Sequence, residues 1–273
     1  MKTGLISVIL PVWKPVFTQL ETCIDSILRQ TYSNLELIIV YKKSPDFDDK
    51  FFNVISKISD ERLKIIIDKN EGFPSQLNLG IKNSSGEFIA RIDGDDYCEI
   101  ERFEKQLEFK KKNKFDVVGS FANYISEDGK KVGIFRVPLS HDEIRRMIML
   151  RNTMIHPAIL MDRKIFDYIG LYDSSFEIAE DYEFWLRAMS KGLKFGNIPE
   201  PLVNVRINPN SVTRGNWKRD RAYTLKAKNK AIFHYGFHRP RDIASYIPTI
   251  FYYFISKKNA KRIRKILNIK TGE

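Results

Sequence analysis

Apolar positions along the chain follow two alternating patterns. Short runs such as Leu5–Trp13 and Leu35–Tyr41 are apolar at nearly every position, which is typical of strands buried on both faces of a sheet. Between these runs, residues 17–30 place apolar side chains three or four positions apart, the spacing of a helix face. The alternation of strand and helix predicts an α/β fold with a mixed, mainly parallel sheet flanked by helices.

The alternation continues through the first half of the chain and then changes. We expect further strands at 63–67, 87–92 and 116–125, and helices at 47–58, from Pro74 to Gly80 or soon after it, and at 101–112. Next come a tight turn at 127–129, a helix near 141–151, a strand near 157–161 and a helix over 180–191. A polar loop over 208–216 precedes helical stretches that continue to the end.

The composition is that of a folded protein, with 43% hydrophobic and 29% charged residues among 273. Two cysteines, Cys23 and Cys98, are too few for a disulfide scaffold or a cysteine-rich zinc site, which suits a reducing cytoplasm. No stretch approaches the ~20 apolar residues that span a bilayer. The first apolar run contains Pro11 and lacks a small-residue cleavage site, so we interpret it as a strand and not as a signal peptide.

The net charge of +12 is unevenly distributed. From Arg214 to the end there are 16 basic and 3 acidic residues, net +13, whereas residues 1–213 hold 30 basic and 31 acidic residues, net −1. This asymmetry favours a polyanionic partner at the C-terminal end: a membrane surface, a phosphorylated acceptor or nucleic acid.

The end of the chain combines this charge with apolar and aromatic side chains. Residues 243–255 are apolar and aromatic, and residues 257–270 are basic with apolar positions at helical spacing. Such a segment suits peripheral contact with an anionic membrane through residues 243–273. The alternative is that its apolar face packs on the body of the protein or on a second copy in a homodimer. No recognition module accompanies the charge, so we expect no nucleic-acid partner.

The strongest chemical signal is the acidic turn, Asp93-Gly94-Asp95-Asp96, which follows a predicted strand ending in Arg91-Ile92. Ligands of open α/β sheets bind beyond the carboxyl ends of strands. Clustered carboxylates suit a hard divalent cation such as Mg²⁺ or Mn²⁺, which often also binds substrate phosphates, and Gly94 allows close approach. The alternative is a solvated acidic turn that caps the next helix.

A second acidic group, Glu180-Asp181, precedes an apolar helix face. Either residue could act as a general base, or it could simply cap the helix, where acidic side chains are favoured by the dipole. His156, Asn78, Gly80 and Cys98 are weaker candidates, of which Gly80 is typical of a packing position. We find no P-loop, GxGxxG, HExxH or GxSxG motif.

Several segments, in this order, resemble family 2 glycosyltransferases of the GT-A fold, of the bacterial cell-surface polysaccharide type. These segments are Ser7–Trp13, Gln30–Val40, Asn70–Gly80, Phe88–Asp96, Ile155–Pro157, Gly170–Asp173 and Ala179–Arg187. The resemblance implies a GT-A domain over residues 1–213, with a nucleotide-binding half (1–97) and an acceptor half (98–213). Residues 214–273 would form a basic, partly amphipathic helical extension.

The resemblance also implies a reaction: metal-assisted transfer of a sugar, with inversion, from a nucleotide-sugar to a glycan or lipid-linked acceptor. Asp181 would be the catalytic base and Glu180 its orienting partner, and Asp93 and Asp95 would hold the metal. The residues implied to bind the nucleotide-sugar are Pro11, Val12, Lys42, Asn78, Arg91, Asp93 and Gly94. His156 and Trp185 would line the acceptor side. The protein would work in the cytoplasm, peripherally on the inner face of the plasma membrane.

Three positions depart from the pattern that the resemblance implies. Lys42 stands near a position where relatives have a carboxylate that contacts the base, Leu77 stands where many have arginine, and Asn208 replaces a histidine that can help bind metal. A cation cannot accept the hydrogen bond that a carboxylate accepts, so Lys42 could instead meet a phosphate. These departures keep open a non-catalytic sugar-nucleotide-binding or scaffold protein of the same fold. A sugar nucleotidyltransferase is a further alternative.

Overall fold

The structure, a computed structural model, describes residues 1–69, 72–207 and 217–254. The strands are β1 (Lys2–Val12), β2 (Leu35–Lys42), β3 (Leu63–Asp68), β4 (Gly86–Arg91), β5 (Tyr97–Cys98), β6 (Val117–Ile125), β7 (Lys131–Phe135), β8 (Leu160–Asp162) and β9 (Phe195–Arg206). The helices are α1 (Phe17–Leu28), α2 (Pro45–Ile55), α3 (Phe73–Lys82), α4 (Arg102–Asn113), α5 (His141–Met147), η1 (His156–Ala158), α6 (Lys164–Ile169), α7 (Glu180–Ser190), α9 (Trp217–His234) and α10 (Pro240–Phe254).

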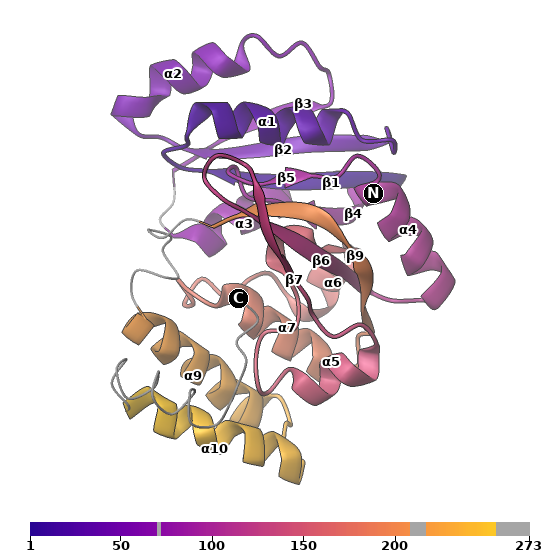
Figure 1. Ribbon diagram of the computed structural model, residues 1–273, viewed down its shortest axis with the longest axis vertical. Coiled ribbons are helices and arrows are strands. Elements are labelled where there is room, and N and C mark those ends of the chain that lie inside the picture. Colours follow the sequence, from indigo (N-terminus) through magenta and orange to yellow (C-terminus); the bar gives the residue numbers. More distant parts are fainter. Residues whose placement is uncertain (70–71, 208–216, 255–273) are drawn as a thin grey trace.

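The strands within these ranges form one sheet in the order β3-β2-β1-β4-β8-β6-β9-β5, with β7 paired to β6 (Figure 1). Its first half is parallel: β1 pairs with β2 and β4, and β2 pairs with β3. In register, Val12 lies beside Tyr41 and Ile9 beside Arg91. The carboxyl ends of β1, β2 and β4 therefore meet at one edge of the sheet, where the acidic turn follows β4.

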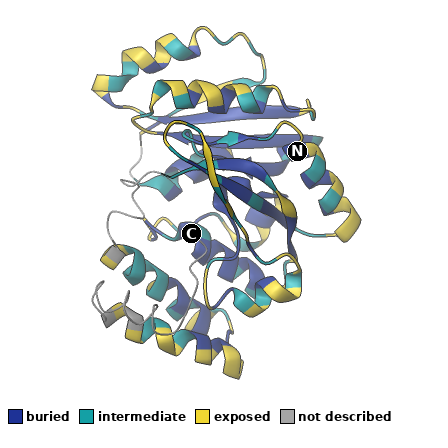
Figure 2. Ribbon diagram, in the orientation of Figure 1, coloured by how far each residue is buried: buried dark blue, intermediate teal, exposed yellow. Residues whose placement is uncertain are grey.

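The central strands are buried on both faces because their alternate side chains enter two separate cores. In β1, Val8 and Leu10 face one core, which α1, α2 and α4 cover, whereas Ile9 faces the other, which α3, α5, α6, α7 and α9 cover. Figure 2 shows the sheet in dark blue between more exposed helices. Burial of each such aliphatic side chain contributes about 1.5–3 kcal/mol, so the near-continuous apolar runs specify this layering.

The second half of the sheet contains parallel and antiparallel pairs, which confirms the predicted mixed sheet. β8 lies antiparallel between β4 and β6, and β9 runs parallel to β6. The sequence pattern did not predict β9, because Pro199 and Pro201 disfavour a central strand. The structure accommodates them where the register slips: Ser120 pairs with Ile198, but Phe121 pairs with Pro201.

Several predicted boundaries were wrong for identifiable local reasons. The strand expected at 157–161 begins as the 3₁₀ turn η1, because Pro157 fixes its own backbone and lacks an N–H, and β8 starts only at Leu160. The helix expected at 141–151 ends at Met147, and the helix expected at 47–58 starts at Pro45 and ends at Ile55. The turn at 127–129 is confirmed, with Gly129 in the left-handed region at φ 82°.

Gly80 has the packing role expected of it, and α3 ends soon after it, at Lys82, as predicted. A Cβ atom there would lie 2.7 Å from Ile9 Cγ2, so α3 can approach β1 this closely only with glycine at this position.

The helical extension packs on the main body. α9 contacts α7, and α10 contacts α9 at the end of the molecule remote from α2 (Figure 1). Across the ranges that the structure covers, none of the helices is both long enough and apolar enough to cross a membrane. The predicted loop at 208–216, Asn208 and the basic stretch 257–270 lie outside the described residues.

Candidate active site

The acidic turn beyond β4 forms a tight group of carboxylates. Asp93, Asp95 and Asp96 each place an oxygen within 4.8 Å of the others. Arg91, the last residue of β4, forms an ion pair with Asp93. Burial and mutual repulsion raise the pKa of Asp95 and, more strongly, that of Asp96. These carboxylates therefore favour a bound proton or a cation.

Asp96 differs from its two neighbours because it is also part of the framework. Its Oδ1 accepts a hydrogen bond from the Arg206 backbone N–H at 2.8 Å, which joins the turn to the end of β9. Its Oδ2 is buried and has no hydrogen-bond partner. An orphaned carboxylate oxygen beside two half-buried carboxylates is a donor set that fits a hard divalent cation. Asp93 and Asp95 would be its accessible ligands.

Two arginines that the sequence analysis did not single out hold the turn in place. Arg102 is completely buried in α4 and donates to the carbonyl oxygens of Arg91 and Ile159, both at 3.1 Å. Arg206 donates through Nε to the Asp95 carbonyl oxygen at 3.1 Å. Arg102 also donates to Cys98 Sγ at 3.2 Å, so Cys98 has a structural role. A buried arginine on a helix carries no periodic signal that would distinguish it from an exposed one.

The acidic pair lies at the first turn of α7. Ala179 adopts a left-handed backbone, with φ 62°, and α7 starts at Glu180. Glu180 is only 7% exposed, and burial, reinforced by the charge of Asp93, raises its pKa to about 7, while Arg91 opposes the rise. Asp181 is half-buried, and burial followed by the charge of Glu180 raises its pKa as well.

Both oxygens of Asp181 are held in place. Oδ1 accepts a hydrogen bond from the Tyr182 backbone N–H, and Oδ2 accepts one from Asn152 Nδ2, each at 2.7 Å. The amide of Asn152 is itself oriented, because its Oδ1 accepts from the Met154 N–H at 3.2 Å. Asn152 thus presents its N–H to Asp181 and not its oxygen. The sequence analysis missed this residue because an asparagine in a loop is usually a turn residue.

The structure places the acidic turn and the acidic pair near each other, since the charge of Asp93 acts on Glu180. The charge of Arg91 acts on both Asp93 and Glu180. His156 lies behind the pair, with Nδ1 3.6 Å from Glu180 Oε1 and Nε2 3.0 Å from the Tyr172 hydroxyl. Burial, followed by the nearby charge of Arg91, lowers the pKa of His156 to about 3, so its ring is neutral.

The other predicted site residues lie around this group in different environments. Lys42 Nζ is 5.7 Å from the centre of the exposed Trp13 ring, at the edge formed by β1 and β2. Pro11 and Val12 are buried at the end of β1. Asn78 has both ends of its amide engaged by the Tyr172 backbone, at 2.8 and 3.0 Å, so it fixes the segment that carries Tyr172.

Trp185 differs from the expectation that it lines the acceptor side. It is completely buried in the core, and its ring meets the His156 ring edge to face, with centroids 5.9 Å apart. Trp185 lies on the apolar face of α7 and points inward, because the apolar stripe of an amphipathic helix packs against the sheet. It therefore supports His156 from behind and offers no surface to an acceptor.

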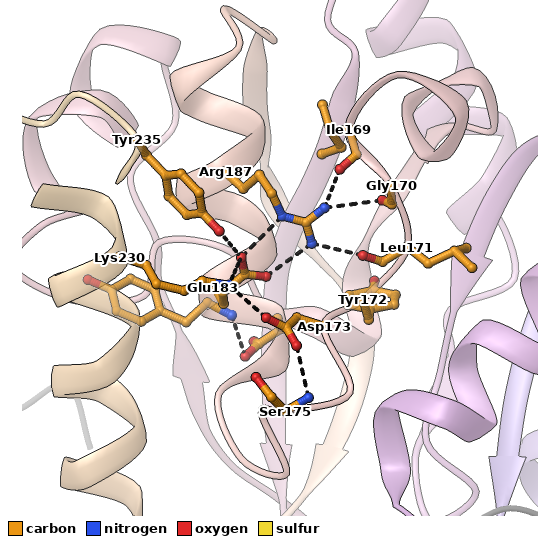
Figure 3. A network of polar contacts seen from close by, with 12 residues as sticks. Ile169, Gly170, Leu171, Tyr172, Asp173, Ser175, Glu183, Arg187, Lys230 and Tyr235 are labelled. Carbon is orange, nitrogen blue, oxygen red and sulfur yellow. Dashed lines mark hydrogen bonds and ion pairs between the residues drawn. The ribbon is translucent and has the colours of Figure 1, made fainter. Parts of the chain in front are cut away.

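A buried network fixes the orientation of α7, and with it the acidic pair (Figure 3). Glu183 is completely buried and accepts hydrogen bonds from Arg187 Nε and Nη2, at 3.1 and 3.0 Å. Arg187 also donates to the backbone carbonyls of residues 169–171. Lys230 of α9 and Tyr235, the residue that follows α9, contact Glu183 from the other side. Helix α9 therefore completes the support of the site.

The fold is that of GT-A glycosyltransferases. A crystal structure of Staphylococcus aureus TarS residues 1–349 in complex with UDP-GlcNAc aligns with a TM-score of 0.68 over 97% of this chain and 76% of that one, at 16% identity. Residues 7–170 match the family model described as glycosyl transferase family 2. The chain belongs to this family, which confirms the resemblance inferred from its motifs.

Relatives in sequence agree with this assignment. An uncharacterised glycosyltransferase of Haemophilus influenzae is 31% identical over 205 residues, which are 71% of this chain and 63% of that protein. The amylovoran biosynthesis glycosyltransferase AmsE of Erwinia amylovora is 28% identical over 71% of this chain and 73% of its own length. The chain thus spans less than two thirds of the Haemophilus protein's length.

Proposed function

We propose that this protein transfers a sugar from a nucleotide-sugar donor to a hydroxyl group of a glycan or lipid-linked acceptor, with inversion at the anomeric carbon. The proximity of the acidic turn to the acidic pair carries this proposal. Within one site, the donor diphosphate needs a cation, which the acidic turn could hold, and the acceptor hydroxyl needs a base, which the acidic pair could supply. Two similar proteins support it: AmsE is named for amylovoran biosynthesis, and TarS residues 1–349 were crystallised with UDP-GlcNAc.

Asp181 is the proposed general base. It lies half-buried at the start of α7, and its two hydrogen bonds leave further lone pairs free to accept a proton. As the acceptor oxygen attacks the anomeric carbon, its proton passes to Asp181 while the bond from that carbon to the diphosphate breaks on the opposite face. Burial raises the pKa of Asp181, which strengthens it as a base relative to an exposed aspartate.

Glu180 orients this base and the acceptor. Its pKa of about 7 lets it exchange a proton near neutral pH, and the neutral His156 ring lies beside it. A protonated Glu180 would donate a hydrogen bond toward the acceptor without adding a second negative charge beside Asp181.

Asp93 and Asp95 are the residues that would hold Mg²⁺ or Mn²⁺ together with the donor diphosphate. Such an ion neutralises the charge that develops on the leaving nucleotide diphosphate. Arg91 and Lys42 add protein cations toward the same edge of the sheet, and Gly94 lets the backbone approach the ligand. We place the enzyme peripherally on the cytoplasmic face of the plasma membrane, where a lipid-linked acceptor would be found.

Replacing Asp181 by asparagine tests this proposal. We expect Asp181→Asn to reduce transfer by about 100- to 10,000-fold, the usual contribution of a general base, and to leave nucleotide affinity unchanged. Nucleotide release from a panel of donors, with glycan acceptors, measures the first quantity and calorimetry the second. Glu177→Gln, at an exposed ion pair with Arg219, is the matched control.

Near-normal turnover in Asp181→Asn would refute the assignment of the base. If the wild-type protein binds nucleotide diphosphates but neither hydrolyses nor transfers any donor, the non-catalytic sugar-nucleotide-binding alternative is correct. Release of pyrophosphate from a nucleoside triphosphate would instead indicate a nucleotidyltransferase.

A further inference from the structure

We infer that the outer face of α10 docks on an anionic lipid surface. This face is a stripe defined by Ile243, Ile247 and Phe251, which lie four residues apart and are 43%, 45% and 65% exposed. A spacing of four places these side chains along one side of a helix. From Ile243 to Phe254 the helix has no charged residue. Exposed apolar side chains gathered in a charge-free stripe are typical of a surface that contacts a partner or a membrane.

The opposite side of α10 is anchored to the protein by polar contacts, so the stripe cannot be its packing face. Asp242 is buried and accepts two hydrogen bonds from Arg145 of α5, at 2.9 and 3.0 Å. Thr249 accepts a hydrogen bond from the buried Lys228 of α9 at 2.6 Å, and Tyr246 donates to Asn229 of α9. These anchors fix which side of α10 points outward, and Figure 2 shows exposed residues along that side.

The positive charge near α10 favours an anionic lipid surface, and not a second copy or nucleic acid, as the partner of this face. Arg239 and Arg241 are exposed at the N-terminal end of α10, and seven basic and no acidic residues follow α10 between positions 255 and 270. A second copy would bring two segments of net +13 together, which mutual repulsion disfavours. Nucleic acid would use the charge but not the apolar stripe. An anionic bilayer uses both, since apolar side chains enter its interface while cations attract its headgroups.

This inference extends the proposed function by placing the enzyme at the surface that would carry a lipid-linked acceptor, but it is tested without donor or acceptor. The full chain is mixed with vesicles of phosphatidylcholine alone, or of phosphatidylcholine and phosphatidylglycerol in equal parts, and the bound fraction is measured by flotation. We expect binding to the anionic vesicles that weakens as salt is added.

The double variant Ile247→Ser/Phe251→Ser replaces the two most exposed of the three stripe residues and leaves every charge in place. We expect it to bind anionic vesicles at least about tenfold more weakly than the wild type, because two large apolar side chains no longer enter the interface. The matched control is Phe52→Ser, at a 42% exposed phenylalanine on α2 at the other end of the molecule. Circular dichroism checks that both variants are folded.

Three results would overturn the inference. In the first, the wild-type chain does not bind anionic vesicles. In the second, the double variant binds them as well as the wild type does. In the third, the wild-type chain does not bind vesicles but forms a dimer, and the double substitution makes it monomeric. Donor turnover in the absence of membrane is a separate measurement, so failure of the docking inference and failure of the proposed transfer reaction are distinguishable.

Discussion

At the scale of single residues, the site depends on carboxylates kept in unfavourable surroundings. Glu180 is almost fully buried without a cation in direct contact, and its pKa of about 7 records the cost of ionising it there. Such groups cluster at functional sites because reactivity near neutral pH requires them. The packing of the rest of the fold offsets the free energy that the burial of Glu180 costs.

Glu180→Gln should therefore stabilise the protein in a pH-dependent way. Folding raises the pKa of Glu180 from 4.5 to about 7, so the wild type loses stability as pH rises through that interval. Glutamine cannot ionise, so Glu180→Gln should raise the free energy of unfolding by about 3 kcal/mol above neutral pH. Below about pH 4.5 the variant and the wild type should have nearly the same stability. Urea unfolding across this pH range measures the difference, with Glu177→Gln as the exposed control. A gain that is independent of pH would contradict this explanation.

Asn152 should act as a positioning residue for Asp181. Its hydrogen bond lowers the pKa of Asp181 and fixes the carboxylate, as the Met154 N–H fixes the Asn152 amide. In Asn152→Ala, the pKa of Asp181 rises further, so the acidic limb of the pH profile of kcat should move to higher pH, while donor affinity stays the same. Asn83→Ala, which removes an exposed amide that contacts only its own helix, is the control. An unmoved acidic limb would show that Asn152 has only a structural role.

At the scale of elements, the position of the acidic pair is set by contacts that α7 makes far from the chemistry. The left-handed Ala179 begins the helix, the apolar stripe seats it on the sheet, and the Glu183 network joins it to α9 (Figure 3). The predicted extension after residue 213 thus contributes to the support of α7, because its first helix, α9, contacts α7.

Glu183→Ala should reveal this support as a large loss of stability. It removes one partner of a buried ion pair and leaves Arg187 with an uncompensated charge, which typically costs about 3–5 kcal/mol. Glu177→Ala, which breaks the exposed pair with Arg219, should cost no more than about 1 kcal/mol. Chemical denaturation measures both. Equal effects of the two variants would show that the network does not hold α7.

At the scale of the whole molecule, ligand binding and stability are linked. A nucleotide diphosphate that binds together with Mn²⁺ should stabilise the protein by about 2.7 kcal/mol at a ligand concentration of 100 Kd. For a chain of this size the melting temperature should rise by roughly 5–10 °C. Asp95→Ala should abolish the part of the shift that requires Mn²⁺, as measured by thermal shift with and without the ion. An undiminished Mn²⁺-dependent shift in that variant would exclude Asp95 as a ligand.

The sequence by itself determined the features that depend on local patterns. Continuous apolar runs predicted β1, β2 and β4, because a strand buried on both faces is apolar at nearly every position. Helical spacing predicted α1 and α7, because a helix buried on one face has apolar residues three or four positions apart. The order of motifs identified the family. The two acidic groups were visible because carboxylates in a turn after a strand, or at a helix start, are distinctive without any knowledge of their neighbours.

Only the tertiary structure decided what those groups meet. Glu180 and Asp93 lie 87 positions apart in the chain, and their interaction follows from the packing of α7 against the sheet. The burial that raises the pKa of Glu180, the inward direction of Trp185, and the contacts of Arg102 and Asn152 all arise between segments distant in sequence. Side-chain type and spacing carry no record of such contacts, because many partners would satisfy the same local pattern.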